Sequence, residues 1–335
     1  MSVEMAAVNQ FFTLINGTKI PAIGLGTYQG DAGNSKVREI VRRALELGYR
    51  HLDSATAYGN ERAIGQAIRE SGIPRKEIYV TTKLAQTWHK PSDVAQALDE
   101  SLTALGLDYV DLYLMHYPHA YQSDADHNTK RHPSGNGKPL IDYDLSRNYV
   151  ATWKAMEDLL QTGKVKAIGV SNFNILKIRK LIENARVTPA VNQVELHPYL
   201  PQHDLVQFCQ DNGVLVMAHQ PLGGRPVGVV RAHPNVPPPT EDPKILDIAS
   251  RSGMSPAQVC LSWAVQRGIA VIPKSAQEEH MKENLALEKL SDGCFNVVDK
   301  LSEIRGPIRF LDPKPHLGFD IFDEENDQPV EEEAS

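Results

Sequence analysis

The sequence predicts a (β/α)8 barrel, in which each of eight parallel strands is followed by an outer helix. Eight short apolar runs alternate with amphipathic stretches, and no linker of distinct composition separates them. The apolar runs do not alternate with polar residues, as expected for strands that are buried on both faces. No G-x-G-x-x-G turn follows the first run, which argues against an open, doubly wound sheet.

A short hairpin is expected first, at residues 11–21, because Asn16-Gly17 favours a two-residue turn. Glycines 48 and 106 suit the ends of the first and third barrel helices, and Ser255-Pro256 suits the start of a later one. Asn60 is expected to cap the second helix. The predicted barrel strands lie at residues 23–26, 51–53, 78–82, 110–115, 167–170, 191–194, 215–218 and 270–273.

Three features lie outside the regular repeat. Residues 118–147 and 221–241 form long irregular inserts, which in a compact domain are usually functional. Two extra helices are expected near residues 278–285 and 291–304. A single domain over residues 1–322 would be followed by an acidic, disordered tail at 323–335.

The composition excludes several classes of partner. Residues 320–335 hold eight Asp and Glu, and removing these charges from the net of −7 leaves +1, so the body is nearly neutral. This balance argues against nucleic acid and anionic membranes as partners. No apolar stretch approaches the roughly 20 residues that span a bilayer. Three scattered cysteines and the absence of a signal-like start favour the cytoplasm, and the lack of heptads favours a monomer.

Polar residues gather at the predicted carboxyl ends of neighbouring strands, where barrels carry their chemistry. Asp53, Lys83 and His116 lie at or just past the ends of the second, third and fourth strands, and Tyr58 follows in the loop after the second. A phenol has a pKa of about 10, so Tyr58 needs nearby positive charge to become a useful proton donor. We expect these four side chains to meet.

Long segments around these residues resemble the aldo-keto reductase superfamily. The likeness extends over about residues 12–322 and is carried by residues 48–65 (GYRHLDSATAYGNERAIG), 105–116 (LGLDYVDLYLMH), 166–173 (KAIGVSNF), 191–198 (VNQVELHP) and 272–275 (IPKS).

The resemblance implies an oxidoreductase that reduces an aldehyde or ketone to an alcohol by hydride transfer from NAD(P)H, without metal. Tyr58 would act as general acid, and Lys83, held by Asp53, would lower the pKa of Tyr58. His116 would orient the carbonyl group. The four residues identified from the strand ends are thus the catalytic set that the family implies.

The same resemblance implies a cofactor site, to which Asp53 would also contribute. Ser171, Asn172 and Gln193 would hold the nicotinamide carboxamide. Thr27 and Tyr28 would border the nicotinamide ribose. The other implied positions are His219, Gln220 and Leu222 beside the nicotinamide, Lys274, Ser275 and His280 at the adenosine phosphate or ribose, and Glu283 and Asn284 at the adenine.

Two positions depart from the family pattern. His219 stands where a Tyr usually stacks on the nicotinamide, in a Tyr-Ser-Pro-Leu-Gly run. His280 stands where an Arg usually pairs with the 2′-phosphate, and Glu278 and Glu279 precede it. A neutral imidazole is a weaker phosphate partner than a guanidinium. NADP(H) is favoured because Lys274 and Ser275 remain, and NAD(H) stays possible.

The expected substrate pocket is lined by Tyr28, Tyr58, His116 and Tyr117. Ala85 stands where many family members carry a Trp, which predicts a roomier pocket, and Trp88 lies nearby. The two inserts and residues 307–322 would form the rim. Hydrophobic and sugar-derived carbonyl compounds both fit this description.

Three other functions are considered. A metal-dependent hydrolase would need paired ligands at the strand ends, which the histidines do not provide, so no metal is expected. A Schiff-base aldolase would use Lys83 as its nucleophile. A cofactor-binding regulatory subunit would keep the fold with little turnover.

Overall fold

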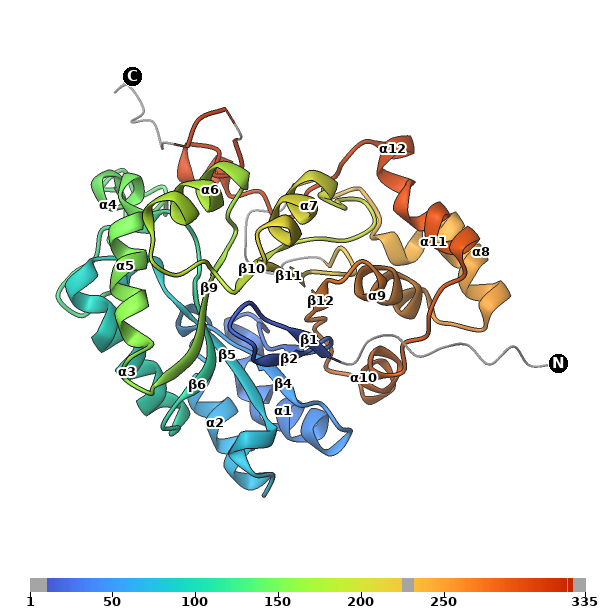
Figure 1. Ribbon diagram of the computed structural model, residues 1–335, viewed down its shortest axis with the longest axis horizontal. Helices are drawn as coiled ribbons and strands as arrows, with labels where there is room; N and C mark the ends of the chain where they lie inside the picture. The colour runs from blue at the N-terminus through green and yellow to red at the C-terminus, as the bar shows by residue number, and fades with distance from the viewer. Residues whose placement is uncertain (1–10, 225–231, 324, 328–335) are drawn as a thin grey trace.

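The computed structural model describes residues 11–224, 232–323 and 325–327, and within them eight parallel strands form one curled sheet (Figure 1). The sheet order is β12-β11-β10-β9-β6-β5-β4-β3, and a parallel bridge between Ile23 and Val271 joins its two edges. The predicted (β/α)8 barrel is therefore confirmed. Its strands are β3 (Leu25–Gly26), β4 (His51–Asp53), β5 (Tyr79–Leu84), β6 (Val110–Met115), β9 (Val165–Ser171), β10 (Val191–Glu195), β11 (Leu215–His219) and β12 (Ala270–Val271).

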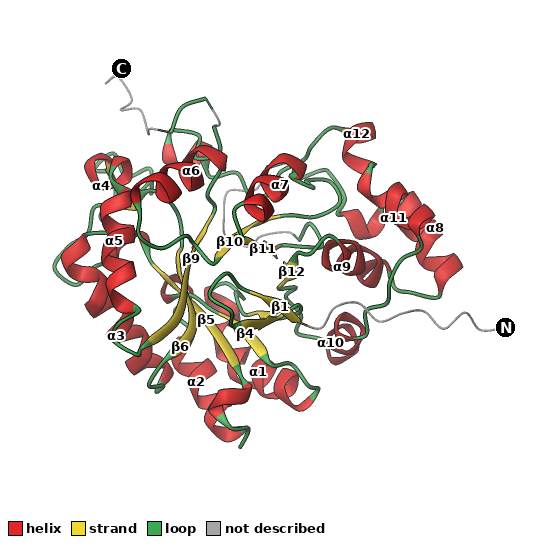
Figure 2. Cartoon of the chain, in the orientation of Figure 1, coloured by secondary structure: helices red, strands yellow, loops and turns green. Residues whose placement is uncertain are grey.

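One helix follows each strand and together the helices surround the sheet (Figure 2). They are α1 (Val37–Glu46), α2 (Glu61–Glu70), α3 (Val94–Leu105), α5 (Tyr149–Leu159), α6 (Ile175–Asn184), α7 (His203–Asp211), α9 (Pro256–Gln266) and α10 (Glu278–Leu285). Short 3-10 turns occur at η1 (Asp31–Lys36), η2 (Thr56–Tyr58), η3 (Arg75–Glu77), η4 (Gln86–Trp88), η5 (Pro91–Asp93) and η6 (Pro239–Glu241).

Three further helices pack together on one side of the barrel (Figure 1). They are α8 (Pro243–Ser252), α11 (Asp292–Asp299) and α12 (Leu301–Arg305). The sequence analysis did not predict α8, whose residues follow directly after the second insert. The helix expected at 291–304 is divided into α11 and α12 at Lys300.

Local residues explain most helix boundaries. Gly106 adopts a left-handed φ of 65° at the end of α3, a conformation that strains residues with a Cβ. Ser255 and Gln258 form a reciprocal capping box at the start of α9. Asn60 occupies the N-cap position of α2 as predicted, although its side chain makes no capping hydrogen bond. Its side chain instead donates to the Thr27 carbonyl at 3.0 Å and accepts from Ser54 at 2.9 Å, which ties two loops at the carboxyl end together.

The amino end of the barrel is closed by the predicted hairpin, β1 (Phe11–Thr13) paired with β2 (Lys19–Pro21). Leu14 and Ile20 are buried there against the barrel interior, which includes Leu112, Leu114 and Met217. A second and larger apolar layer fills the space between the sheet and the helices. Ligands therefore reach the interior from the carboxyl end.

The first insert contains a small ladder, β7 (Ala120–Tyr121) with β8 (Ile141–Asp142), and then α4 (Tyr143–Arg147). Near the C-terminus α13 (Lys314–Leu317) precedes Phe319 and Ile321, which pack on Ile141. Residues 225–231 of the second insert lie outside the described residues, as do residues 324 and 328–335 of the expected tail. The domain boundary at residue 322 stays a prediction. None of the described helices has the length and apolarity needed to cross a membrane.

Buried histidines should make the fold sensitive to acid. His89 is fully buried, and within the described residues neither ring nitrogen has a hydrogen-bond partner. Burial lowers its pKa from 6.5 to about 3, so below pH 6.5 the unfolded chain binds a proton that the native state does not. Stability therefore falls as the pH falls from 6.5 toward 3.

The free energy of unfolding should fall between pH 6.5 and pH 5 in the unmodified protein. We predict that this fall is about 1–2 kcal/mol smaller in His89→Leu. Urea denaturation at both pH values measures the difference. His132→Leu, at an exposed position, is the matched control and should leave the pH dependence unchanged. Equal pH slopes for His89→Leu and the unmodified protein would contradict this role of His89.

Candidate active site

The centre of the site is a buried ion pair between Lys83 and Asp53. The two side chains are 0% and 2% exposed, and Lys83 Nζ lies 2.6 Å from Asp53 Oδ1. Asp53 is the last residue of β4, whereas Lys83 lies within β5, which extends two residues beyond its predicted end. Lys83 also donates to the Ser54 carbonyl at 2.8 Å, and Gln193 donates to Asp53 Oδ2 at 2.7 Å. Both charges are therefore compensated without water.

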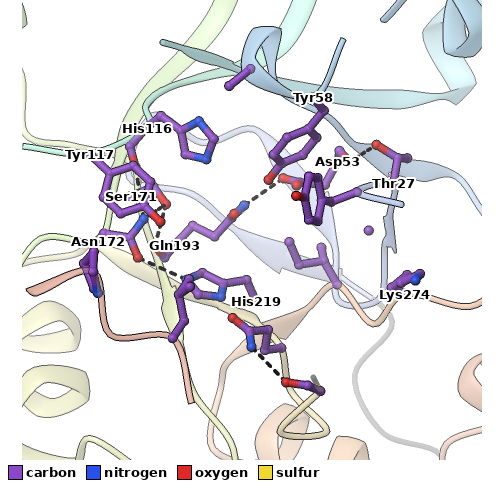
Figure 3. Close-up of a pocket in the computed structure, with 18 of the residues that line it drawn as sticks. Thr27, Asp53, Tyr58, His116, Tyr117, Ser171, Asn172, Gln193, His219 and Lys274 are labelled. Atoms are coloured by element: carbon purple, nitrogen blue, oxygen red, sulfur yellow. Dashed lines mark hydrogen bonds between the residues drawn. The ribbon is translucent and has the colours of Figure 1, made fainter. Parts of the chain in front are cut away.

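Tyr58 stands over this pair, at the end of the η2 turn that follows β4. Its hydroxyl lies 3.4 Å from Lys83 Nζ. The rings of Tyr28 and His116 flank it, with centroids 5.0 Å and 5.6 Å from its own. Figure 3 shows Tyr58, Asp53 and Gln193 meeting at one side of the cavity. The structure thus brings together the four residues predicted from the strand ends.

Burial dominates the electrostatics of the Tyr58 hydroxyl. Burial raises the pKa of Tyr58 well above its usual value, and the charges of Asp53 and Tyr28 raise it further. The lowering contribution predicted for Lys83 stays a prediction, because the net shift is dominated by burial of the phenol. At neutral pH Tyr58 is a phenol that holds its proton next to a cation.

His116 follows β6 and faces the cavity as a neutral imidazole. Burial lowers its pKa well below the usual value, and the nearby charge of Lys83 lowers it further. Among the described residues its Nδ1 has no hydrogen-bond partner. The ring can therefore hydrogen-bond a ligand but does not carry a positive charge at neutral pH.

These residues border a cavity of about 560 Å³ at the carboxyl end of the barrel, within the usual range for a ligand site (Figure 3). Lys83 lies behind it and is not among the lining residues. The predicted site residues that line the cavity are Thr27, Tyr28, Asp53, Tyr58, His116, Tyr117, Ser171, Asn172, Gln193, His219, Gln220, Leu222 and Lys274.

One wall carries a chain of polar side chains. Ser171 donates to the Gln193 carbonyl at 2.8 Å, and Asn172 donates to the His116 carbonyl at 3.0 Å. His219 Nε2 lies 3.1 Å from Asn172 Oδ1 (Figure 3). Asn172 has a left-handed φ of 64°, a conformation that asparagine tolerates better than most residues. The wall presents amide, hydroxyl and imidazole groups, which suits a flat polar ring such as a nicotinamide.

Of the residues predicted for the adenosine end, Lys274 lines this cavity, whereas the others lie just before or within α10 and do not line it. Ser275 hydrogen-bonds to the backbone of Gln277, and His280 is exposed. Asn284 is 2% exposed, and its Oδ1 has no hydrogen-bond partner in the described part of the chain. Such a buried acceptor suits the amino group of an adenine. Glu283, which is half-buried, precedes it in α10.

The sequence analysis misplaced part of the substrate side. Ala85 packs in the apolar layer and does not line the cavity, whereas its neighbour Gln86 does. Trp88 stacks on His127 at 3.4 Å between ring centroids instead of facing the cavity. Gln29 also lines the cavity and was not predicted. The segments predicted to form the rim contribute lining residues that were not singled out, namely His119, Tyr121, Leu311, Pro313 and His316. The sequence held a signal for His119 and Tyr121. Tyr117 was predicted to line the pocket, and alternate residues of an extended segment point to the same side.

Two alternative functions receive no structural support. Within the described ranges, no three His, Cys, Asp or Glu residues are grouped so that they could hold a metal ion. Lys83 is fully buried, paired with Asp53 and shielded from the cavity, so its amine is poorly placed to attack a carbonyl carbon.

A phenol, a buried cation behind it and a polar wall thus meet at one cavity at the carboxyl end of the barrel. The Aldo/keto reductase family model matches residues 22–303. The chain therefore belongs to the aldo/keto reductase family. It is an enzyme that reduces carbonyl groups, as predicted, and the regulatory-subunit alternative is not favoured.

Several relatives are similar over nearly their full length. Glycerol 2-dehydrogenase (NADP(+)) of Hypocrea jecorina is 38% identical, with 94% of this chain and 98% of the relative covered. The protein of the same name from Saccharomyces cerevisiae is 42% identical, with 93% of this chain and 97% of the relative covered. Aldo-keto reductase family 1 member A1 of Gallus gallus is 45% identical, with 84% of each chain covered.

The effects of replacing Lys83 and Asp53 on stability should depend on each other. We predict that Lys83→Met lowers the free energy of unfolding by about 3–5 kcal/mol, because Asp53 is left buried and unpaired. Adding Asp53→Asn to this variant should restore part of the loss. Urea denaturation of the unmodified protein, the two single variants and the double variant measures these free energies of unfolding.

The surface pair Lys164–Asp99 is the matched control, because it has the same 2.6 Å separation but is about half exposed. Lys164→Met should cost less than about 1 kcal/mol. Additive effects of Lys83→Met and Asp53→Asn would show that the two groups do not depend on each other.

Proposed function

We propose that this enzyme reduces a small aldehyde or ketone to its alcohol with NADPH, and that Tyr58 donates the proton. The observation that carries the proposal is the position of the Tyr58 hydroxyl, which lines the cavity and lies 3.4 Å from Lys83 Nζ. A positioned donor next to a fixed cation stabilises the negative charge that develops on a carbonyl oxygen as it is reduced.

Each of the four residues has a separate role in this proposal. Tyr58 holds a proton at neutral pH and passes it to the substrate oxygen. Lys83 then stabilises the phenolate, and Asp53 keeps the ammonium in place. His116 is neutral and hydrogen-bonds the carbonyl oxygen, so it orients the substrate without adding charge.

The residues of the polar wall would hold the cofactor, which when bound supplies a hydride to the carbonyl carbon. Ser171, Asn172 and Gln193 have side chains suited to a carboxamide, and His219 offers a flat ring for stacking. Lys274 is exposed and lines the cavity, so it is available to a 2′-phosphate. The preference for NADP(H) is further supported by the NADP(+) in the names of two relatives.

Relatives and the cavity support a proposal for the substrate class. Two relatives are named glycerol 2-dehydrogenase, and a third, from Saccharomyces cerevisiae and 40% identical, is named aldehyde reductase YPR1. The distal cavity wall carries His119, Tyr121 and His316, which can hydrogen-bond hydroxyl groups. We therefore favour small hydroxylated carbonyl compounds, with dihydroxyacetone, the product of oxidising glycerol at its central carbon, as the first to test. The cytoplasmic location and the monomeric state expected from the sequence belong to this proposal.

Tyr58→Phe tests the central role. The variant should lose at least about 10²–10³-fold in kcat, because the proton donor is removed while the ring remains. Its affinity for NADPH, measured by fluorescence titration, should stay nearly unchanged. NADPH consumption with dihydroxyacetone and a panel of other carbonyls gives the rates. A variant that turns over at the original rate would remove Tyr58 from the mechanism.

The cofactor preference has its own test. We predict that kcat/KM is higher with NADPH than with NADH, and that Lys274→Met reduces this ratio by about tenfold, or ~1.4 kcal/mol. Lys289→Met, at another exposed lysine, serves as the control. A preference for NADH would contradict the proposal, and an unchanged ratio in Lys274→Met would place the phosphate elsewhere.

A further inference from the structure

The carboxylate of Asp327 joins the C-terminal segment to two barrel helices. Both of its oxygens accept from the Tyr149 hydroxyl, at 3.0 Å and 2.9 Å. Lys180 Nζ lies 2.8 Å from Oδ2, and Lys177 Nζ lies 3.4 Å from Oδ1. Tyr149 begins α5, and both lysines belong to α6. We call these four residues the Asp327 latch.

The latch is more than a surface ion pair. The side chains of Asp327 and Lys177 are only 18% and 4% exposed, so solvent screens their charges weakly. Lys180 Nζ also lies 4.8 Å from the centre of the Tyr149 ring. Burial raises the pKa of Tyr149, and the Asp327 charge raises it further, so the phenol remains a hydrogen-bond donor.

The chain also contacts the barrel just before the latch, at Asp323. Asn174 at the start of α6 donates to the Asp323 carbonyl at 2.5 Å. The Asp323 carboxylate accepts from the backbone N–H of Glu325 at 2.8 Å and of Asn326 at 3.3 Å. Figure 1 shows this red C-terminal segment lying over α6. The segment is therefore attached to the barrel at two successive places.

The segment just before the latch forms a wall of the substrate cavity. Leu311, Pro313 and His316 line the cavity. Phe319 and Ile321 are buried with Ile141, against Tyr117 and Tyr121. Ile321 lies only six residues before Asp327, so the wall and the latch are close neighbours in the chain.

The latch also lies directly behind the cavity. A small pocket of about 10 Å³, about enough for one water molecule, is bordered by His119, Lys177, Phe319 and Asp327. His119 borders the large cavity as well, and its ring lies 6.1 Å from that of Phe319. A displacement of Asp327 would therefore reach the substrate cavity through a single layer of side chains.

A second route connects the latch to the polar wall. The Tyr149 ring packs edge-on against Phe173 at 5.5 Å between centroids. Phe173 follows Asn172 in the chain, and its carbonyl accepts from Asn192 at 2.9 Å. The latch thus touches elements on both sides of the cavity.

We propose that Asp327 is a positioning residue that holds residues 307–322 as a rigid cavity wall and thereby sets a preference for small over bulky carbonyl compounds. The proposal deepens the function proposed above and rests on its assignment of the cavity to the substrate. A wall held close to Tyr58 orients a small substrate, whereas a released wall yields to a bulky one.

The test compares Asp327→Ala and Asp327→Asn with Glu325→Ala. Glu325 is the matched control, because within the described ranges its exposed side chain makes no hydrogen bond or ion pair, yet it carries the same charge in the same segment. For each variant, kcat/KM is measured with NADPH for dihydroxyacetone and for p-nitrobenzaldehyde. Hydrogen exchange over residues 307–323 and the Kd for NADPH are measured in parallel.

We expect Asp327→Ala to reduce the ratio of kcat/KM for dihydroxyacetone over p-nitrobenzaldehyde by about tenfold, mainly through a higher KM for dihydroxyacetone. Exchange over residues 307–323 should become faster, and the Kd for NADPH should not change. Asp327→Asn keeps an acceptor for Tyr149 but loses the charge, so its effect should be intermediate. Glu325→Ala should match the unmodified enzyme.

An unchanged ratio in Asp327→Ala, with faster exchange, would reduce the latch to a structural contact and overturn the proposal. An equal effect of Glu325→Ala would also overturn it, since tail charge alone would then be the cause. If Asp327→Ala does not fold, Tyr149→Phe replaces it, because it deletes a hydroxyl without altering charge. If the unmodified enzyme reduces neither compound, the proposed substrate class fails, and the ratio is taken between the smallest and largest carbonyls that it does reduce.

Discussion

The site depends on one buried positive charge, the ammonium group of Lys83. Removing such a group from water costs several kcal/mol unless its surroundings supply opposite charge and hydrogen-bond acceptors. Asp53 and the Ser54 carbonyl supply them, and the parallel pairing of β4 with β5 sets their distance. The loops around the pair are tied to it as well, since Thr27 donates to the Asp53 carbonyl. The backbone around the site is thus arranged so that this charge remains compensated.

The same charge shapes the protonation states around the cavity. Burial, reinforced by Lys83, lowers the pKa of His116 well below its usual range and that of His219 to about 4. Both rings are therefore neutral at physiological pH. Tyr58 keeps its proton because burial disfavours the charged phenolate. The cavity thus presents a neutral proton donor and neutral imidazoles in front of a fixed cation, which suits an uncharged carbonyl substrate.

The two ends of the barrel differ because different segments cover them. The hairpin closes the amino end with apolar side chains, so no ligand enters there. The carboxyl end is bordered by the first insert and the C-terminal segment, which pack on each other through Ile141 and Phe319. These segments are far apart in sequence and meet only in the folded chain. Selectivity can therefore depend on contacts, such as those of Asp327, that lie outside the reacting centre.

Sequence alone determined the barrel and the meeting of Asp53, Tyr58, Lys83 and His116, because periodicity defines strands and parallel strands end at one edge. It did not reveal helix α8, the bond from Asn60 to Thr27, or the lining residues Gln86 and His119. Tertiary structure alone decided the direction of the Tyr58 pKa shift, because desolvation depends on every group that surrounds the phenol. The attachment of Asp327 to α5 and α6 was likewise invisible in an acidic run that resembles a solvated tail.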